Sequence, residues 1–260
     1  MDIPYFHVDA FTDKVFRGNP AGVCLLDEWP ADSILQAIAA ENRHSETAFL
    51  SRDGDAWRLR WFTPAMEVDL CGHATLAAAA VLFTQKLIST DRVQFETMSG
   101  RLAVERSEEN IYVLDFPSRP GRQIEILPEL TKGLGQKPLA VYKSRDLLAV
   151  FNSEEKVRGL RPDFTQLATL DCLAVIATAP GEKVDFVSRC FAPAAGIDED
   201  PVTGSAHCTL IPYWAHRLKR KKLHARQVSA RSGELLCEMA GDRVLIGGQA
   251  TFYMSGTIHV

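Results

Sequence analysis

The sequence predicts an α+β protein of two pseudo-symmetric domains, each a curled, barrel-like mixed β-sheet around a central α-helix. The main observation is a segment that recurs about 130 residues further along the 260-residue chain. Its first copy is residues 60–65 (Arg-Trp-Phe-Thr-Pro-Ala) with 71–75 (Cys-Gly-His-Ala-Thr), and its second is 189–194 (Arg-Cys-Phe-Ala-Pro-Ala) with 203–207 (Thr-Gly-Ser-Ala-His). A single long-period repeat indicates two related halves rather than a solenoid. Short strand patterns and one apolar helix pattern in each half complete the prediction.

The first half is predicted at residues 1–117. Aromatic and β-branched residues favour strands, Gly-Asn-Pro clusters favour turns, and Asp32 or Ser33 can cap a helix. The expected order is strand 5–11, turn 17–22, strand 23–26, helix 32–40, strand 46–51, a hairpin through 53–55 into strand 57–62, helix 74–83, and strands 93–97, 102–106 and 111–116. Alanine and leucine lie on every side of the helix at 74–83, which predicts that it is buried all round.

The second half is predicted at residues 118–249, after a Pro- and Gly-containing stretch at 116–121 that is typical of a domain boundary. It repeats the order of the first half with strands at 147–151, 173–177 and 185–191, a helix from about Ser205, a hairpin near Ser232 and a strand at 244–246. Pro212 is expected to kink that helix or end it early. A last strand at 250–260 is expected to pack back on the first half, with a site in the cleft between the halves.

Composition narrows the class of protein. The chain is 46% hydrophobic and 24% charged with a net charge of −4, which fits a globular protein and gives no reason to expect nucleic acid or a membrane as partner. The basic run at 217–222 is interpreted as the solvated end of a helix. Without an apolar span or a signal-like N-terminus, the chain is expected to be cytoplasmic.

The six cysteines lack C-x-x-C pairing, so they are expected to be free thiols in a reducing compartment. A zinc site would need clustered ligands, which Cys190, His207 and Cys208 do not provide at their spacing. No nicotinamide, flavin or pyridoxal fingerprint is present either. We therefore expect neither a metal nor a cofactor.

Two helix starts, at Gly72 and Gly204, are the first candidates for binding. The unpaired N–H groups and partial positive charge of a helix N-terminus favour an anion, and glycine allows a ligand to approach the backbone. Two such ends at one cleft would form an anion or oxyanion pocket. The alternative is that both are ordinary helix N-termini, with Ser205 as a cap.

Glu46, His73 and Asp200 are the candidates for proton transfer. Glu46 precedes an apolar strand, and a carboxylate partly removed from water suits general acid–base work. The alternative is an exposed glutamate at a strand end. His73 occupies the repeat position of Ser205, where a neutral imidazole can shuttle protons. Asp200 belongs to residues 198–200, which we interpret as an acidic insertion that only the second copy carries; negative charge before a helix is also structurally favourable.

Cys71 precedes a helix N-terminus, where a thiol can be reactive. Its repeat mate is Thr203, so a pair of thiols acting as acid and base is not available. Covalent thiol catalysis would need His73 as a base, and two residues on one tight turn are not expected to face each other.

The motifs together resemble the PhzF family. They are 18–22 (Gly-Asn-Pro-Ala-Gly), 44–49 (His-Ser-Glu-Thr-Ala-Phe), 69–75 (Asp-Leu-Cys-Gly-His-Ala-Thr) and 200–207 (Asp-Pro-Val-Thr-Gly-Ser-Ala-His), in the family's order and along the whole chain. The resemblance implies the fold of diaminopimelate epimerase. It also implies that Glu46 moves the proton, that His73, Asp200 and Ser205 assist, and that Gly72 and Gly204 offer N–H groups to a substrate carboxylate. Asn19 is similar in position to a substrate-contacting asparagine of the epimerases.

The predicted function is therefore a cofactor-independent isomerase of a small carboxylate-bearing metabolite, acting through Glu46, with a homodimer expected from the resemblance. Thr203 departs from the two-cysteine epimerases and argues against racemisation by a thiol pair. Two hypotheses remain open: an epimerase or thiol enzyme that uses Cys71, and a small-molecule binding protein without turnover.

Overall fold

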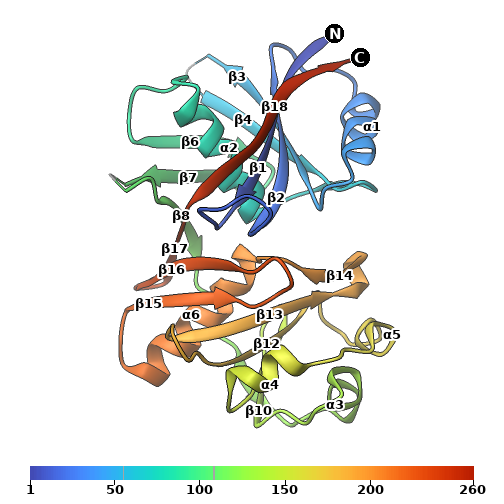
Figure 1. Ribbon diagram of the computed structural model, residues 1–260, viewed down its shortest axis with the longest axis vertical. Coiled ribbons are helices and arrows are strands. Elements are labelled where there is room, and N and C mark those ends of the chain that lie inside the picture. The colour runs from blue at the N-terminus through green and yellow to red at the C-terminus, as the bar shows by residue number, and fades with distance from the viewer. Residues whose placement is uncertain (55, 108) are drawn as a thin grey trace. The chain divides into compact units, whose positions relative to one another are not determined.

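The computed structural model describes residues 1–54, 56–107 and 109–260, so the expected hairpin tip at Asp55 lies outside the described residues. The chain forms two compact units (Figure 1). The first comprises Met1–Asp115 with Gly247–Val260, and the second comprises Phe116–Ile246. Both contain mixed sheets and few helices, which confirms the predicted α+β class. Among the described helices, none combines the length and the apolar character needed to cross a bilayer.

Unit 1 contains two helices and most of the strands of the first half, closed by the last strand of the chain. Its elements are β1 (Asp2–Ala10), β2 (Asn19–Leu26), α1 (Asp32–Asn42), β3 (Thr47–Asp53), β4 (Ala56–Phe62), β5 (Glu67–Val68), α2 (Gly72–Thr84), β6 (Arg92–Thr97), β7 (Gly100–Arg106), β8 (Tyr112–Pro117), which ends in unit 2, and β18 (Ala250–His259). β18 runs antiparallel to β1, with Asp2 opposite His259, so the two ends of the chain meet within this unit (Figure 1).

Unit 2 contains the remaining strands, one long helix and several short ones. Its elements are β9 (Arg122–Ile124), α3 (Pro128–Leu134), β10 (Ala140–Lys143), β11 (Leu147–Val150), α4 (Glu154–Gly159), α5 (Phe164–Leu167), β12 (Val175–Pro180), β13 (Phe186–Ala192), the 3₁₀ turn η1 (Pro193–Ala195), β14 (Ile197–Asp200), α6 (Gly204–Leu218), β15 (Lys222–Gln227), β16 (Gly233–Ala240) and β17 (Arg243–Gly248), which ends in unit 1.

The strand pairing of unit 1 recurs in unit 2. Along β1, β2, β3, β4, β6 and β7 the successive pairs are antiparallel, parallel, antiparallel, parallel and antiparallel. Along β10, β11, β12, β13, β15 and β16 the order is the same. β5 pairs with β4 as β14 pairs with β13. The repeat found in the sequence is therefore a repeat of topology, with α2 corresponding to α6.

In unit 1 the sheet separates two helices. Residues Gly72–Phe83 of α2 are all buried, as predicted, and the helix contacts β1, β2 and β3. On the opposite face, Leu35 and Ile38 of α1 pack with Tyr5 and Phe49 in a second cluster. Alternate side chains of a strand point to opposite faces, so each strand contributes to both layers.

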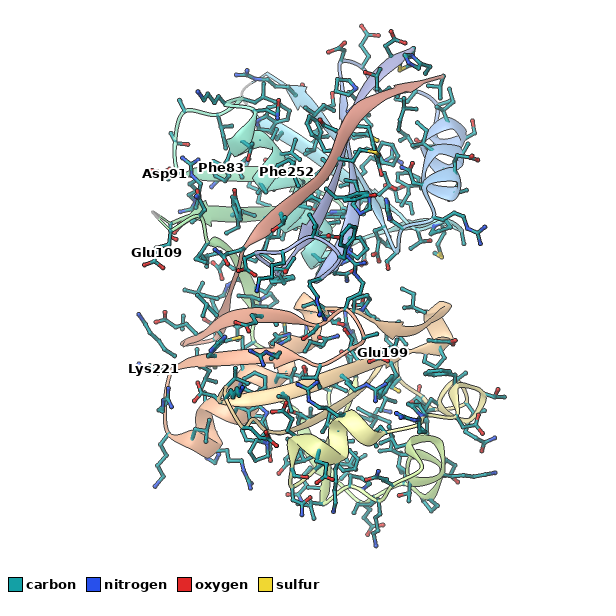
Figure 2. The ribbon with its side chains drawn as sticks, in the orientation of Figure 1. Phe83, Asp91, Glu109, Glu199, Lys221 and Phe252 are labelled. Atoms are coloured by element: carbon teal, nitrogen blue, oxygen red, sulfur yellow. The ribbon has the colours of Figure 1, made fainter. Side chains whose placement is uncertain are left out.

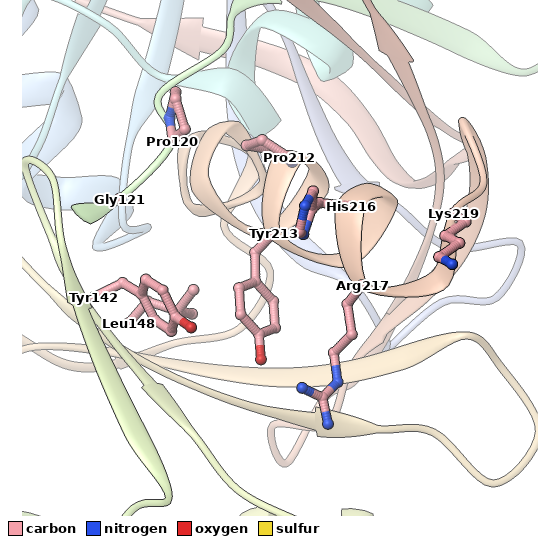
Figure 3. A pocket seen from close by; sticks show the side chains of 9 residues that line it. All are labelled: Pro120, Gly121, Tyr142, Leu148, Pro212, Tyr213, His216, Arg217 and Lys219. Carbon is pink, nitrogen blue, oxygen red and sulfur yellow. The ribbon is translucent and has the colours of Figure 1, made fainter. Parts of the chain in front are cut away.

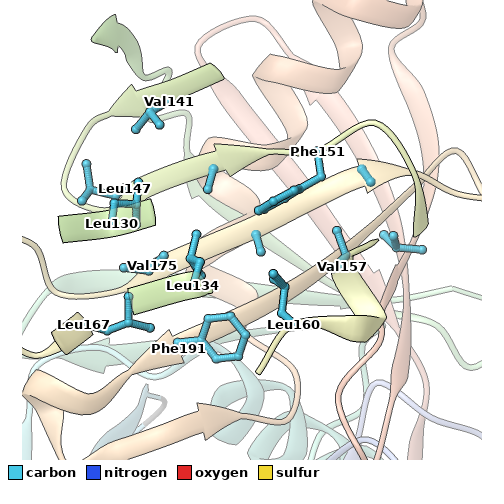
Figure 4. Close-up of a cluster of buried hydrophobic side chains, with 14 of the residues drawn as sticks. Leu130, Leu134, Val141, Leu147, Phe151, Val157, Leu160, Leu167, Val175 and Phe191 are labelled. Atoms are coloured by element: carbon cyan, nitrogen blue, oxygen red, sulfur yellow. The ribbon is translucent and has the colours of Figure 1, made fainter. Parts of the chain in front are cut away.

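Unit 2 has the same three layers. Odd-numbered residues of β12, such as Val175 and Ala177, pack with Leu134 and Leu167 from the short helices (Figure 4). The even-numbered Thr178 points the other way and accepts a hydrogen bond from Trp214 Nε1 of α6 at 2.9 Å. Unlike α2, α6 is buried only in part, because its second half leaves residues 212, 213 and 215–218 partly or fully exposed.

The acidic stretch before α6 is not the insertion that the sequence suggested. Arg60 bonds both carboxylate oxygens of Glu67 at 2.7 Å, and Arg189 does the same to Glu199 at 2.7 and 2.8 Å. Glu199 thus matches Glu67 at an offset of 132 (199 − 67), the offset of the helix glycines, so the added residues lie before Glu199, at the 3₁₀ turn. Asp200 consequently has a counterpart in the first copy, Val68, because Asp200 pairs with Cys190 as Val68 pairs with Trp61.

One local prediction was wrong, and so was one of the two alternatives offered by another. The expected turn at 17–22 is a strand from Asn19 onward, because its backbone pairs with β1. Pro212 does not end α6, which continues to Leu218. A proline leaves the carbonyl four residues earlier without its helical donor. Here Cys208 O accepts from Arg119 N at 2.8 Å instead, so the helix loses one internal bond without leaving a carbonyl unsatisfied.

Candidate active site

In unit 1, the start of α2 places His73 beside Glu46. Cys71 is the N-cap, so His73 is the second residue of the helix. Its Nε2 lies 3.4 Å from Oε2 of Glu46, which arrives from the segment between α1 and β3. The side chains of His73 and Glu46 are 5% and 14% exposed. An exposed strand-end glutamate is therefore not what the structure contains; its carboxylate is largely enclosed and faces an imidazole.

Asn19 fixes the other side of the same ring. Its Nδ2 lies 3.1 Å from His73 Nδ1, and Asn19 is fully buried. Gly18 precedes it with a φ of +62°, and a Cβ there would lie 2.1 Å from Ala10 O, so only glycine fits. This turn directs Asn19 into β2. The sequence suggested a substrate contact for Asn19, whereas its immediate partner in the structure is His73.

His73 is a neutral imidazole. Burial lowers its pKa to about 3, and the nearby His44 adds to the effect because a second positive charge would be repelled. A neutral ring has one N–H. Since the amide nitrogen of Asn19 is a donor, we assign the lone pair to Nδ1 and the proton to Nε2. The protonated Nε2 is then the ring nitrogen that lies 3.4 Å from Oε2 of Glu46.

Cys71 also faces His73, contrary to the expectation from their spacing. Its Sγ lies 3.5 Å from His73 Nδ1, and both residues are buried. A thiol and a base can form a nucleophilic pair. However, the ring is a weak base because its pKa is so low, and its Nδ1 is shared with Asn19.

Glu46, Cys71 and His73 also bring ligand-type atoms within 4.8 Å of one another. Thiolate, imidazole and carboxylate are donors that zinc accepts. Here the sulfur faces Nδ1 and the carboxylate faces Nε2, on different edges of one ring. An ion bound through either nitrogen would therefore be turned away from one of the other two donors, and the arrangement fits proton transfer better than metal ligation.

In unit 2, the start of α6 holds Asp200 through a network of short bonds. Thr203 is the N-cap of the helix, rather than Ser205, and its hydroxyl donates to Asp200 Oδ2 at 2.5 Å. Gln227 is fully buried; its Oε1 accepts from Thr203 N at 2.9 Å and its Nε2 donates to Asp200 O at 2.7 Å. Asp200, the last residue of β14, is therefore held in place by the N-cap of α6 and by the end of β15.

Ser205 has a cation beside it. Arg145 Nη2 donates to Ser205 Oγ at 3.2 Å, while Arg145 also bonds both carboxylate oxygens of the buried Asp146. Gly204 is the first residue of the helix, where N–H groups have no partner within the helix. Positive charge, a hydroxyl and helix N–H groups are thus gathered at this end of α6, which suits an anion.

The predicted residues therefore fall into two groups. Glu46, His73 and Asn19 meet at the start of α2 with Gly72, and Asp200, Gly204 and Ser205 meet at the start of α6. Sequence reasoning missed Gln227 and Arg145. Gln227 reaches the site through the pairing of β15 with β13, in which it lies opposite Ser188, and Arg145 lies in the loop between β10 and β11. Neither residue belongs to a local motif that would have indicated it.

Comparison with known proteins first defines the class of fold. A hydroxyproline epimerase from Agrobacterium vitis, solved with bound trans-4-hydroxy-L-proline, has a TM-score of 0.62 over 99% of this chain and 92% of its own, at 11% identity. A predicted epimerase from Pseudomonas aeruginosa has a TM-score of 0.74 at 19% identity, over 99% of each chain. The fold is that of the epimerase class.

More similar proteins identify the family to which the chain belongs within this class of fold. Residues 8–256 match the family model described as phenazine biosynthesis-like protein, PhzC-PhzF. A protein of Pseudomonas aeruginosa named an uncharacterized isomerase is 53% identical over the whole of both chains. The crystal structure of a PhzF-family protein from Enterococcus faecalis superimposes with a TM-score of 0.98, at 49% identity and full coverage of both chains. This chain belongs to the PhzF family.

Proposed function

We propose that the protein is a cofactor-independent isomerase that moves a proton within a small carboxylate-bearing metabolite, with Glu46 as the acid and base. The observation that carries the proposal is the enclosed Glu46 carboxylate, whose Oε2 lies 3.4 Å from Nε2 of a neutral His73 that Asn19 holds in place. The name of the 53% identical relative supports the isomerase class.

In the proposed reaction, Glu46 takes a proton from one carbon of the substrate. The electron pair of that C–H bond moves into a conjugated double-bond system of the substrate. The protonated Glu46 then returns the proton to another carbon of the same molecule. Atoms and charge balance within the substrate and Glu46. His73 does not titrate in this scheme; its Nε2–H orients the carboxylate and stabilises its charged form.

The substrate's carboxylate is assigned to the groups at the start of α6. Gly204 and Ser205 offer a backbone N–H and a hydroxyl, and Arg145 adds a positive charge beside Ser205. Asp200, fixed by Thr203 and Gln227, is assigned to a polar group of the substrate. These assignments predict that Ser205→Ala and Arg145→Gln raise KM more than they lower kcat.

Deuterium labelling of a metabolite mixture tests the proposal for any substrate of this class. A bacterial metabolite extract is incubated in deuterated water with the protein and followed by mass spectrometry. We expect a carboxylate-bearing metabolite to gain deuterium with the wild-type protein and with Glu41→Gln, a matched change at an exposed glutamate of α1. Glu46→Gln should leave that metabolite unlabelled, and equal labelling by this variant would remove Glu46 from the mechanism.

A second candidate is a thiol enzyme, which the 3.5 Å contact between Cys71 and His73 favours. It requires His73 to accept the thiol proton, which the low pKa of this ring opposes. In the same labelling experiment, loss of labelling in Cys71→Thr together with full labelling in Glu46→Gln would select this candidate.

A further inference from the structure

Unit 2 contains a hollow of about 650 Å³ that the proposed reaction does not use (Figure 3). It lies against the second half of α6. Tyr213 is eight residues beyond Ser205, which corresponds to about 12 Å along a helix axis. The residues that line it come from α6 and its C-cap residue, from the strands β10 and β11, and from the segment before β9: Pro120, Gly121, Tyr142, Leu148, Pro212, Tyr213, His216, Arg217 and Lys219.

The walls of this hollow are fixed by main-chain contacts. Ser118 N donates to Asp242 O at 2.9 Å and Arg119 N donates to Cys208 O at 2.8 Å, which holds the segment that carries Pro120 and Gly121 against α6. A Cβ at Gly121 would lie 2.9 Å from Tyr142 Cβ, so glycine allows the close approach of these two segments of the chain. Leu148, another of the lining residues, is almost completely buried. A ligand would therefore enter a site whose shape already exists.

The wall offers aromatic rings to a ligand. Tyr142 and Tyr213 contact edge to face, with their centroids 5.2 Å apart, and both remain partly exposed. Figure 3 shows both rings directed into the same space. Two prolines, Pro120 and Pro212, add apolar surface. Tyrosine and proline surfaces of this kind bind planar rings by stacking and by burying apolar area.

The charge of the hollow selects the sign of the ligand. Arg217 and Lys219 belong to the basic run that the sequence suggested was merely a solvated helix end. Both line the hollow, His216 lies beside them, and none of its nine described lining residues is acidic. The carboxyl end of α6 contributes roughly half a negative charge, which two full positive charges outweigh. Arg217 lies over the ring of Trp214 at 5.9 Å, which helps to position its guanidinium.

We propose that this hollow is a second binding site, for a small aromatic compound that carries one carboxylate or phosphate group. The ring packs against Tyr142 and Tyr213, and the anionic group pairs with Arg217 and Lys219. The planar guanidinium of arginine can bond either anion with two N–H groups. The site is independent of the proposed reaction at Glu46, and its test requires no turnover.

Naphthalene-2-carboxylate is a suitable probe, because its two rings fit the volume of the hollow. In an NMR titration of the wild-type protein we expect saturable binding with a Kd of about 1 mM or tighter, the affinity typical of a ligand of this size. Naphthalene-2-carboxamide and acetate, which lack the charge or the rings, should bind at least about tenfold more weakly. Naphthyl phosphate and inorganic phosphate, compared in the same way, show whether the hollow also binds a phosphate group.

The basic run provides a matched control. Arg217→Gln and Lys219→Gln should weaken binding, the former by about tenfold, because each removes a charged partner. Lys221→Gln, at an exposed lysine of the same run outside the hollow, should change nothing (Figure 2). Tyr213→Ser tests the aromatic wall. If this variant does not fold, the comparison of Arg217→Gln, Lys219→Gln and Lys221→Gln still decides whether the ligand binds in the hollow.

Three results would overturn the proposal. They are no saturable binding of the carboxylate up to about ten times the expected Kd, equal binding of the amide, or equal effects of Arg217→Gln and Lys221→Gln. Sedimentation of the probe-free protein supplies a fourth. If the chain self-associates and Arg217→Gln or Tyr213→Ser dissociates it, the hollow is covered by a second copy and is not a small-molecule site.

Discussion

α2 and α6 begin alike and end differently. Each starts with glycine after a β-strand that an Arg–Glu pair braces, and each has an extended N-cap residue. α2 is then buried along its length, whereas the second half of α6 leaves one face of the helix exposed to solvent. The second residue of the helix also differs: it is His73 in α2 and Ser205 in α6. The shared features maintain the fold, and the features that differ supply the candidate chemistry.

The shared feature that can be compared most directly is the arginine fork, the pair of hydrogen bonds from one arginine to both carboxylate oxygens of a glutamate. Arg60 and Arg189 each bond a glutamate twice and lie over a phenylalanine, at 5.1 and 4.9 Å from the ring centroids. Their further partners differ. Arg60 donates to the exposed Asp32, whereas Arg189 donates to the carbonyls of Val157 and Leu160 at 3.3 and 3.0 Å.

We expect Arg189→Met to lower the free energy of unfolding by about 3 kcal/mol, because it leaves the Glu199 carboxylate without its charged partner and removes a donor from the carbonyls at the end of α4. Arg60→Met should cost about half of that, since its second partner stays in water. Urea unfolding followed separately by fluorescence and by circular dichroism measures both values. Equal losses would show that the two forks are energetically equivalent despite their different surroundings.

A pH-dependent effect on stability is expected from the two buried histidines. Burial lowers the pKa of His73 to about 3 and that of His207 to about 4, although His207 Nδ1 donates to Thr203 O at 2.8 Å. The unfolded chain protonates both near pH 6.5, so it binds more protons than the folded chain below that pH. Stability is therefore lost as pH falls from 6.5 toward 4, by up to about 1.4 kcal/mol per pH unit for each histidine.

His207→Asn should remove the share of this pH dependence that belongs to α6 and keep the share of His73. Unfolding free energies measured at several pH values between 4 and 7 provide the comparison. If the slope of the variant equals that of the wild type, His207 is not neutral in the folded protein, and the parallel drawn between the two helix starts does not extend to their electrostatics.

The smallest effect is expected from metal removal. Because Cys71 and Glu46 face different nitrogens of His73, we expect a chelator to leave the labelling rate unchanged. The protein is treated with excess EDTA, desalted and assayed for deuterium incorporation. A loss of activity that zinc restores would show that the three side chains hold an ion, and the mechanism would then need revision.

The sequence was most informative where function and local pattern coincide. Glu46, His73 and Asn19 belong to three separate motifs, and the structure brings all three together in unit 1. The burial of α2 was equally predictable, since its alanines lie on every side. Each of these predictions rests either on a short local motif or on an uninterrupted apolar pattern.

The failures arose where a distant segment decides the outcome. The Gly and Pro content of Asn19–Gly22 predicts a turn, but this segment is a strand because it pairs with β1. Pro212 reads as a helix end, but Arg119 supplies the missing donor. The position of the insertion could not be found until the Arg189–Glu199 fork showed which acid of the second copy matches Glu67. Gln227 and Arg145 reach the start of α6 only through strand register and a loop, so nothing near them in the chain indicates their role.

The central claim is that the chemistry belongs to the carboxylate of Glu46 and not to the thiol of Cys71, although both face His73. The most direct test compares the initial rate of deuterium incorporation into the labelled metabolite for Glu46→Gln and Cys71→Thr, the latter carrying the residue found at the start of α6. We predict a loss of about 10²–10⁴-fold for Glu46→Gln and a change within about threefold for Cys71→Thr. A Cys71→Thr variant that loses activity while Glu46→Gln retains it would contradict the account.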